Sequence, residues 1–538
     1  MKLENGETSA DNMLDGMTEP RDDEKLVRKS EVVEFFAGRN VLITGGSGFM
    51  GKILVEKLLR TCSSIGKVFL LMRAKKGKTP AERYNEHFED TLYHRLKLEQ
   101  PNFASKVVMI EGQMEEIGLG LSPENRELLK TSHVVFHGAA TVRFDEKLRV
   151  AVNINIRGTK EIFLLAREMP NLKAFVHIGT AFSQCVTKLI EEVFYDPPID
   201  SDKLLSLVNV LDDKQLDLIT PELIGAWPNT YAFTKAVGED VIRKYCTGIP
   251  TCIVRPSIVI ATANEPLPGW INNFYGATGV VAGAGIGLLR TLYCDANSIA
   301  EIIPADYVIN NIIVAAWDVA QTQKLEPNRS LVPVPRLPNP DDDPPIYNSV
   351  SSCQNPITWG EFMLWNEQPG LDVPSEMILW HYFFHLNKDL WVHNIHVTLF
   401  HLVPAAIVDS LAWLTGRKPM MWNAYKKIHK FSGVIAYFSS QQWKFNNDRV
   451  MRLWEKVSPV DRLLFDFNVA SLNWRDYMFY HIRGLRIYLL KDPLNTVPQG
   501  LVKAKKLRIA HYTLATIAFA FMAWLAYVFL RFIFSAFW

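Results

Sequence analysis

Tyr231 and Lys235 are the two residues of this sequence whose types and spacing best fit acid–base chemistry. Residues four apart on a helix lie on one face, so the run Tyr-Ala-Phe-Thr-Lys predicts a phenol beside an ammonium. A tyrosine with a pKa of about 10 is a poor acid–base catalyst at neutral pH, and a nearby cation lowers that pKa by stabilising phenolate. We expect Tyr231 to protonate an oxygen that becomes an alkoxide during a reduction. This spacing is frequent by chance, so its weight depends on the elements around it.

A hydroxyl group is expected to complete this catalytic site. Residues 174–178 are typical of a buried strand, and Thr180 follows its end. Its hydroxyl would donate a hydrogen bond to a substrate carbonyl or to a developing oxyanion. Ser183 is the alternative donor if Thr180 only caps the strand.

A glycine-rich loop earlier in the chain predicts a nucleotide site. Thr-Gly-Gly-Ser-Gly-Phe-Met-Gly occupies residues 44–51, between an apolar run of strand type and a helical pattern at residues 50–62. The glycine spacing permits a tight turn, close approach of a pyrophosphate and close helix packing, and the helix N-terminus presents N–H groups to phosphate. The expected cofactor contacts here are Thr44, Gly45, Ser47, Gly48, Phe49, Met50 and Gly51.

A basic residue follows the second strand, where dinucleotide-binding folds select the ribose. An Asp or Glu there would bind the 2′-hydroxyl of NAD. Arg73 stands there instead, and Lys75, Lys76 and Lys78 come after it. Basic groups fit a 2′-phosphate, so the expected cofactor is NADPH, unless this is only a solvated basic loop. Lys235 would then also hold the nicotinamide ribose.

Alternating strand and helix patterns position these residues. Strands are expected at residues 40–44, 68–72, 107–110, 133–137, 174–178 and 252–254, with helices such as 159–168 and 233–245 between them. This alternation predicts a parallel sheet covered on both faces. The expected fold class is α/β: a Rossmann-type doubly wound sheet, a mainly helical C-terminal domain and a C-terminal transmembrane helix.

Length and composition divide the chain and exclude some functions. With 538 residues, two or more domains are expected: a disordered tail at 1–35, a reductase domain at 36–330, a proline-rich linker at 331–350 and a C-terminal domain at 351–500. The net charge is +1, which gives no support for a nucleic-acid partner. Six scattered cysteines predict neither a zinc site nor a disulfide framework. Three histidines, His393, His396 and His401, are spaced too loosely to predict a metal site.

Two apolar stretches bear on membranes. A transmembrane helix is expected at residues 509–533, because residues 512–530 carry no formal charge and a span needs roughly 20 apolar residues. Lys503, Lys505, Lys506 and Arg508 precede it and place that side in the cytosol. The alternative is a buried terminal helix. Residues 397–414 are also apolar but contain His401 and Asp409, which favours a buried or interfacial helix over a span.

Several motifs resemble the extended short-chain dehydrogenase/reductases and, more closely, the alcohol-forming fatty acyl-CoA reductases of animals. Besides the glycine loop they are His-Gly-Ala-Ala-Thr at 137–141, Asn-Ile-Arg-Gly-Thr at 155–159, Phe-Val-His-Ile-Gly-Thr-Ala at 175–181, Pro-Asn-Thr-Tyr-Ala-Phe-Thr-Lys at 228–235, Arg-Pro-Ser-Ile-Val at 255–259, Glu-Pro-Leu-Pro-Gly-Trp at 265–270, Ile-Pro-Ala-Asp-Tyr at 303–307 and Asn-Pro-Ile-Thr-Trp-Gly at 355–360. The resemblance covers residues 36–495. It implies Ala139 and Pro256 as further cofactor contacts.

The resemblance implies that a long-chain fatty acyl-CoA is reduced through an aldehyde to a primary alcohol, with two NADPH consumed and CoA released. It also implies a lipid bilayer as a partner, and both the endoplasmic reticulum and the peroxisome fit a cytosol-facing enzyme. The family usually has Ser-Thr-Ala where this chain has Gly179, Thr180 and Ala181. If that serine is the third catalytic group, this chain lacks it.

Two other functions share parts of this pattern. A membrane-bound dehydrogenase of sterols or other lipid alcohols would have the same loop, Tyr231 and Lys235. A cofactor-sensing scaffold could use the same fold without catalysis, because fold does not fix function. The sequence predicts neither the acyl-chain length nor the oligomeric state.

Overall fold

The computed structural model describes residues 29–75, 77–327, 329–330 and 339–537. A seven-stranded sheet forms its centre, and every neighbouring pair of strands in it is parallel. In order across the sheet, the strands are β11 (Ile346–Ser349), β7 (Thr251–Pro256), β5 (Ala174–Ile178), β4 (Val134–His137), β1 (Val41–Thr44), β2 (Val68–Met72) and β3 (Val107–Glu111). The chain reverses direction across the sheet beside β1, so a cleft is expected at the carboxyl ends of β1 and β4.

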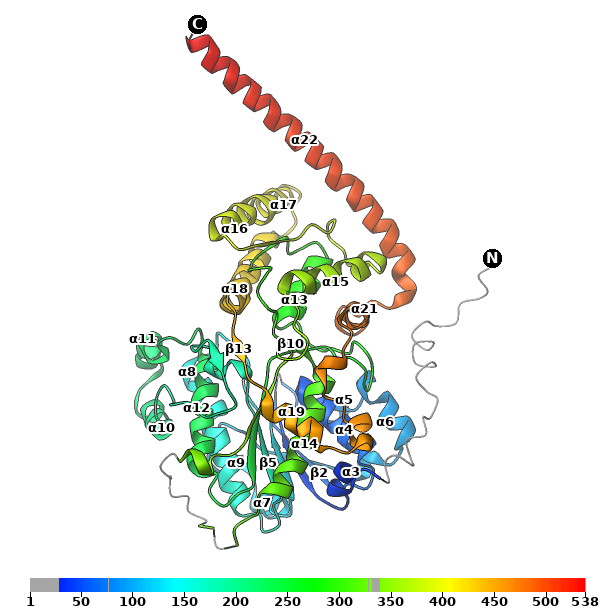
Figure 1. Cartoon of the computed structure of the whole chain (residues 1–538). Helices are drawn as coiled ribbons and strands as arrows, with labels where there is room; N and C mark the ends of the chain where they lie inside the picture. The colour runs from blue at the N-terminus through cyan, green and yellow to red at the C-terminus, as the bar shows by residue number, and fades with distance from the viewer. Residues whose placement is uncertain (1–28, 76, 328, 331–338, 538) are drawn as a thin grey trace, which may run out of the picture.

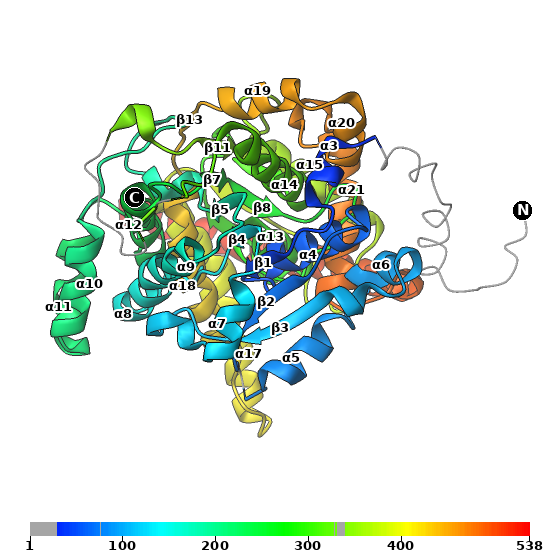
Figure 2. The ribbon, with the colours of Figure 1, turned by 90° about the horizontal axis from the view of Figure 1, so that it is seen from below.

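Helices cover both faces of this sheet (Figures 1 and 2). Alternate residues of a strand point to opposite faces: Val41 and Ile43 of β1 lie in one apolar core, and Leu42 lies in the other. The helices of this half are α3 (Glu31–Phe36), α4 (Phe49–Thr61), α5 (Pro80–His87), α6 (His94–Glu99), α7 (Pro123–Leu129), α8 (Leu148–Val152), α9 (Gly158–Arg167), α10 (Ser201–Val210), α11 (Asp213–Ile224), α12 (Thr230–Tyr245), α13 (Gly276–Gly285) and α14 (Ala305–Thr322). The predicted doubly wound sheet is confirmed.

The C-terminal part is mainly helical, as predicted. It contains α15 (Trp359–Asp372), α16 (Leu390–Val397), α17 (Val403–Leu414), α18 (Met421–Ser439), α19 (Asp448–Lys456), α20 (Pro459–Leu464), α21 (Trp474–Gly484) and α22 (Val497–Phe537). The described residues also form three parallel two-stranded sheets: β8 (Ile258–Ile260) with β10 (Ile302–Pro304), β9 (Thr291–Tyr293) with β12 (His385–Asn387), and β6 (Leu189–Ile190) with β13 (Lys444–Phe445). Two of these sheets join the halves of the chain.

The predicted domain boundaries need two corrections. The expected linker at 331–350 ends in β11, which pairs with β7 in the main sheet; residues 331–338 lie outside the described part. The expected tail at 1–35 lies mostly outside it too, but its end is α3, where Val32 and Phe36 are fully buried. Ser30 caps this helix and also donates a hydrogen bond to Asp461 of α20. The apolar side chains of α3 make it part of the core.

Within the part of the chain that the structure describes, two helical stretches, Leu390–Leu414 and Leu494–Phe534, are long and apolar enough to cross a membrane. The second includes the predicted segment 509–533, and its most apolar window is 0% buried, so the alternative of a buried terminal helix is wrong. The helix α22 extends away from the body of the molecule (Figure 1), and its length and exposure suggest a membrane anchor. Only 11% of the most apolar window of the first is buried, so of the two forms expected there, buried or interfacial, the buried one is wrong.

Candidate active site

A cavity of about 1,280 Å³ lies at the carboxyl ends of the sheet strands. One side is formed by the glycine loop and the ends of β1, β2, β4 and β5, and the other by α13, α15 and α18. The structure brings most of the predicted site residues to its wall: Thr44, Gly45, Ser47, Gly48, Phe49, Met50, Gly51, Arg73, Ala139, Thr180 and Tyr231. The remaining two, Lys235 and Pro256, are buried and are not part of this lining.

The glycine loop is shaped for close approach of a ligand. Gly45 has a φ of 76°, and a Cβ atom there would lie 2.8 Å from the backbone nitrogen of Ala139. A Cβ atom on Gly51 would lie 2.2 Å from the carbonyl oxygen of Gly45. Gly48 precedes α4 without any side-chain cap, so the first N–H groups of α4 are available to a phosphate. The loop therefore fits the pyrophosphate of a dinucleotide.

An aromatic stack supports this loop. The ring of Phe49 lies on that of Trp270, with centroids 5.6 Å apart and an angle of 16° between the planes. The indole nitrogen of Trp270 donates a hydrogen bond to Asp90, and Asp90 accepts another from Lys52 of α4 at 2.6 Å. Trp270 thus holds the start of α4 in place, directly through Phe49 and through Asp90 and Lys52.

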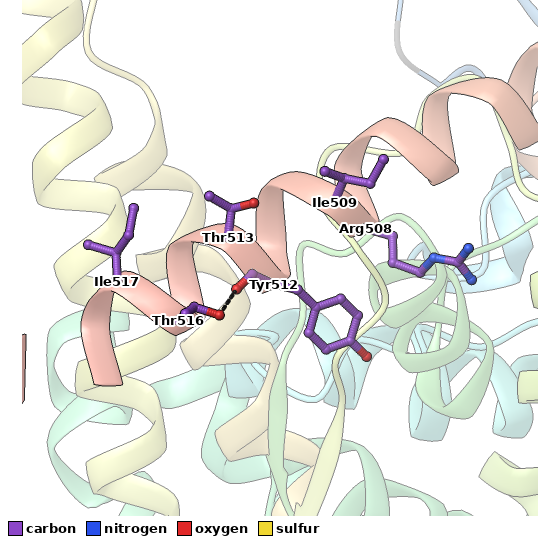
Figure 3. Close-up of a pocket in the computed structure, with 6 residues that line it drawn as sticks. All are labelled: Arg508, Ile509, Tyr512, Thr513, Thr516 and Ile517. Carbon is purple, nitrogen blue, oxygen red and sulfur yellow. Dashed lines mark hydrogen bonds between the residues drawn. The ribbon is translucent and has the colours of Figure 1, made fainter. Parts of the chain in front are cut away.

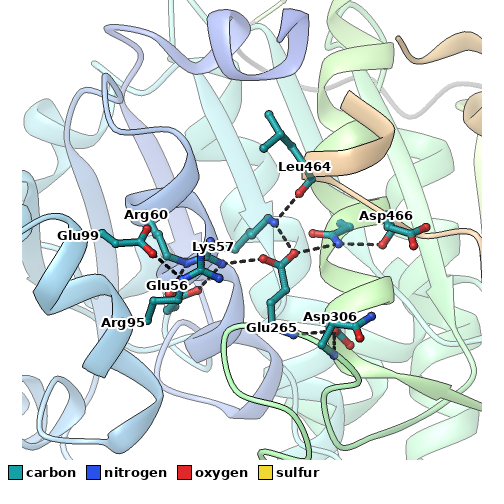
Figure 4. Close-up of polar contacts among 11 residues, drawn as sticks. Glu56, Lys57, Arg60, Arg95, Glu99, Glu265, Asp306, Leu464 and Asp466 are labelled. Carbon is teal, nitrogen blue, oxygen red and sulfur yellow. Dashed lines mark hydrogen bonds and ion pairs between the residues drawn. The ribbon is translucent and has the colours of Figure 1, made fainter. Parts of the chain in front are cut away.

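Ion pairs hold the same segment against α4 (Figure 4). Glu265 accepts hydrogen bonds from Lys57 and, at 2.8 Å, from Arg60, which also pairs with Glu56. Although burial raises the pKa of Glu265, the two cations outweigh it and lower that pKa to about 2. Asp306 accepts hydrogen bonds from three successive backbone N–H groups at residues 263–265. These contacts hold residues 263–270 against α4, the helix that follows the glycine loop.

Basic side chains surround the end of β2, as predicted, but the carboxylate of Glu115 also lies there. Arg73 forms an ion pair with Glu115 at 2.6 Å. Lys75 and Arg83 also line the cavity, and Arg83 donates a hydrogen bond to the Ser47 hydroxyl at 2.8 Å. Sequence reasoning missed Arg83 and Glu115; the capped helix start at Thr79 was the available signal for Arg83, because it places that residue one turn into α5.

The phenol of Tyr231 lies in the cavity beside Thr180 and stacks on Phe144, with ring centroids 5.5 Å apart. Burial raises the pKa of Tyr231 to about 12, against a lowering by the Thr180 hydroxyl. The predicted lowering of this pKa by Lys235 is therefore wrong for the structure described here. The Lys235 ammonium donates a hydrogen bond to the carbonyl oxygen of Ile178 at 2.8 Å.

Lys235 is itself strongly affected by its surroundings. Burial lowers the pKa of Lys235 to about 8, and the negative charge of Glu239 opposes that change. Its charged form is thus only moderately favoured at neutral pH. Pro256 takes part through its backbone, because its carbonyl oxygen lies 3.5 Å from the Thr180 hydroxyl and accepts a hydrogen bond from it.

Gly179 does not remove a hydroxyl from the cavity. A Cβ atom at this position would lie 3.5 Å from the Arg255 side chain and 3.6 Å from Glu239 Oε1, so a side chain there would point toward this buried ion pair. Ser183 points the same way and donates a hydrogen bond to Glu239 at 2.9 Å. Thr180 is the hydroxyl residue of this segment that lines the cavity.

The far end of the cavity is apolar. Val280 of α13, Met363 of α15 and the side chains of Phe431, Val434 and Ile435 of α18 line it. Sequence reasoning did not find this wall, because its residues come from three helices that only tertiary packing brings together.

The histidines considered as metal ligands contact neighbouring side chains and backbone instead. His401 is fully buried, accepts a hydrogen bond from the backbone nitrogen of Arg290 and contacts His429 at 3.1 Å. His393 lies 3.2 Å from the Thr291 hydroxyl. Among the described residues, no group of three His, Cys, Asp or Glu side chains could hold a metal ion.

Known proteins resemble this chain over almost its whole length. Residues 43–312 and 400–492 match two family models that are both described as male sterility protein. Fatty acyl-CoA reductase wat of Drosophila melanogaster is 37% identical over 525 residues, which cover 97% of this chain and 98% of the relative. Fatty acyl-CoA reductase 1 of Rattus norvegicus is 36% identical over 488 residues, which cover 90% and 91%.

Two solved structures share the fold. The terminal R domain from the myxalamid PKS-NRPS biosynthetic pathway has a TM-score of 0.52 and 16% identity, covering 85% of this chain and 93% of its own. The reductase domain of a non-ribosomal peptide synthetase from Mycobacterium tuberculosis has a TM-score of 0.52 and 18% identity, covering 89% and 98%. The family model over half of the chain and the relatives above 30% identity show that the chain belongs to the fatty acyl-CoA reductase family and is an NAD(P)-binding oxidoreductase.

Proposed function

We propose that this protein reduces long-chain fatty acyl-CoA to a primary fatty alcohol, with NADPH as the cofactor and with release of CoA. The observation that carries this proposal is the single cavity in which a dinucleotide loop, the hydroxyls of Tyr231 and Thr180 and an apolar end meet. An acyl chain fits the apolar end, and its carbonyl group would then lie near the two hydroxyls.

The residues of the loop would hold the cofactor. Backbone N–H groups at the start of α4 would bind the pyrophosphate, and Arg73 and Arg83 favour a 2′-phosphate over a free 2′-hydroxyl. When bound, NADPH would supply the hydride for the thioester carbon and, from a second equivalent, for the aldehyde carbon. Lys235 lies one helical turn from Tyr231 and would bind the ribose hydroxyls.

The raised pKa of Tyr231 suits the reductive direction. A phenol with a pKa of about 12 is fully protonated at neutral pH, so Tyr231 is ready to donate a proton to the oxygen of the reduced carbonyl. Thr180 would donate a hydrogen bond to the same oxygen and stabilise its developing charge. In the first reduction this oxygen returns its proton to Tyr231 and re-forms a carbonyl group as the CoA thiolate leaves, which gives the aldehyde. In the second it keeps the proton and the product is the alcohol.

The membrane anchor suggests where the reaction takes place. The basic residues before residue 512 favour a cytosolic face for the catalytic part. Long acyl chains partition into bilayers, so an enzyme held there would meet its substrate at the surface of the endoplasmic reticulum or the peroxisome.

One assay tests the proposal. Detergent-purified protein is given NADPH or NADH and saturated acyl-CoAs of graded length, and alcohol, aldehyde and free thiol are all measured. We expect one alcohol and one thiol for every two NADPH oxidised, and a slower reaction with NADH. Aldehyde without alcohol would refute the two-step reaction, and reduction of lipid ketones without thiol release would favour a lipid dehydrogenase.

A further inference from the structure

A continuous helical stretch, Leu390–Leu414, lies across the end of the molecule from which α22 rises (Figure 1). It comprises α16, a π-helical turn at Thr398–Leu402 and α17, and is called the surface helix below. Only 11% of its most apolar window is buried. A soluble protein seldom leaves so long an apolar stretch uncovered, because such patches are usually binding surfaces.

The exposed side chains of the surface helix form a stripe. Apolar residues recur every four positions along it and are between 37% and 57% exposed. They are Ile395, Leu399, Val403, Ile407 and Leu411. His401 and Ala405, by contrast, are buried against the body of the protein. One face is thus packed and the opposite face is apolar and open, as in helices that lie in the plane of a membrane interface.

Both ends of the surface helix are tied to the body, so it does not cross a bilayer. Before it, β12 pairs with β9. After it, α18 returns to line the cavity with Phe431 and Val434. Asp409 accepts hydrogen bonds from the backbone N–H groups of residues 420–422 and so caps the start of α18. A crossing would carry the start of α18, with its lysines, to the far side of the membrane.

The surface helix lies at the level where the membrane anchor begins. Phe383 contacts both elements: its ring centroid is 5.0 Å from that of Phe400 in the surface helix and 5.4 Å from that of His511 in α22. His511 also accepts a hydrogen bond from the indole nitrogen of Trp380 at 3.1 Å. Residue 512 opens the uncharged part of α22. A bilayer that receives α22 from this point would therefore reach the surface helix as well.

Side chains typical of a membrane interface surround the stripe. Trp391 and Trp413, near its two ends, are 75% and 72% exposed, and indole rings favour the headgroup level. Arg417, Lys418 and Lys426 follow it on the surface and would attract anionic lipid headgroups. On α22, Arg508, Tyr512 and Thr516 line a shallow hollow (Figure 3). Here the basic part of α22 ends and its uncharged part begins.

We propose that the surface helix is a second membrane contact, buried lengthwise in the interface of the leaflet from which α22 enters the bilayer. Two contacts would fix the orientation of the protein, because one helix alone leaves the body free to swing. A membrane contact would also explain why the exposed stripe at 395–411 is apolar, although none of its residues lines the catalytic cavity.

The test measures contact between lipid and single positions in the full-length protein. In a Cys353→Ser background, which removes the exposed cysteine, Ile407→Cys and Leu411→Cys are labelled with an environment-sensitive fluorophore. Val210→Cys is the matched control, because Val210 is an apolar residue on a helix and is 82% exposed. The proteins are reconstituted in phosphatidylcholine vesicles with and without phosphatidylserine. Lipids brominated near the headgroup or near the chain end serve as quenchers.

We expect the shallow bromines to quench residues 407 and 411 several-fold more than residue 210, and the deep bromines to quench them weakly. Strongest quenching by the deep bromines would indicate a transmembrane crossing and overturn the proposal. Equal quenching at 407, 411 and 210 would show that no lipid covers the helix. Blue-shifted emission without lipid quenching, together with a dimer on sizing in detergent, would instead assign the stripe to a second copy of the chain. None of these readouts depends on catalytic activity.

Discussion

Tyr231 lies in α12 and Thr180 follows β5. Each lines the cavity, and its hydroxyl is the group that can act on a substrate. We expect Tyr231→Phe to lower kcat by about 10²–10⁴-fold, because the proton donor is lost while the ring remains. NADPH binding, followed by fluorescence, should change little. Tyr275→Phe is the matched control: Tyr275 also lines the cavity but is 60% exposed. Equal activity of Tyr231→Phe and the wild type would exclude Tyr231 as the proton donor.

Lys235 gives the activity a predicted pH dependence. Its pKa of about 8 means that the ammonium is charged below pH 8 and neutral above it. If the charge binds the ribose, kcat/KM for NADPH should fall as the pH rises through about 8. Lys235→Arg keeps its charge at alkaline pH, so its profile should lack this limb even if its activity is low. The same alkaline limb in both proteins would assign the titration to another group.

The spacing of the site residues made much of the site predictable. The glycine loop, Arg73, Thr180 and Tyr231 follow strand ends or begin helices, and a parallel sheet gathers such positions at one edge. Arg83, Glu115 and Phe144 could not be found in this way, because their places depend on how loops fold over that edge. The pKa of Tyr231 was also unpredictable, since burial outweighs the effect expected from sequence neighbours.

At the level of elements, the ion pairs of α4 with the segment before Trp270 are expected to matter for stability. Glu265→Gln would leave Lys57, whose side chain is 4% exposed, without its carboxylate partner. Such a loss in a buried pair costs about 3 kcal/mol, which should appear as a lower midpoint of thermal unfolding. Glu86→Gln is the matched control: Glu86 pairs with Lys78 on the surface, both being 50% exposed, and should cost about 1 kcal/mol or less. Similar losses in both variants would contradict this difference.

Six of the seven strands of the main sheet were predictable from apolar periodicity, but its seventh strand, β11, and the short helix α3 were not. The helix α3 is only six residues long and directly follows a polar, charged stretch, so from the sequence it was assigned to the tail. In β11, Tyr347 and Asn348 break the apolar run, and the proline-rich stretch before them obscures the strand. Tertiary partners, Asp461 for α3 and β7 for β11, decide both.

At the level of the whole molecule, the apolar end of the cavity is expected to limit acyl-chain length. Val280 of α13 is 4% exposed and lines this end. Val280→Phe should shift the preference toward shorter acyl-CoAs, because the larger ring occupies space that the end of a long chain needs. The same replacement at Val142, which also lines the cavity but is 46% exposed, should leave the preference unchanged. Competition among acyl-CoAs of graded length measures both, and a shift in Val142→Phe alone would reverse the assigned direction of the chain.

The position of β11 in the main sheet also determines where the protein can be truncated. A fragment that stops at residue 330 would leave Ile253 and Val254 of β7, both fully buried in the intact protein, on an open sheet edge. Open apolar edges recruit strands from other molecules, so the isolated first half should precipitate on expression. Soluble protein should return when a peptide that carries residues 339–350 is supplied, since that strand closes the edge.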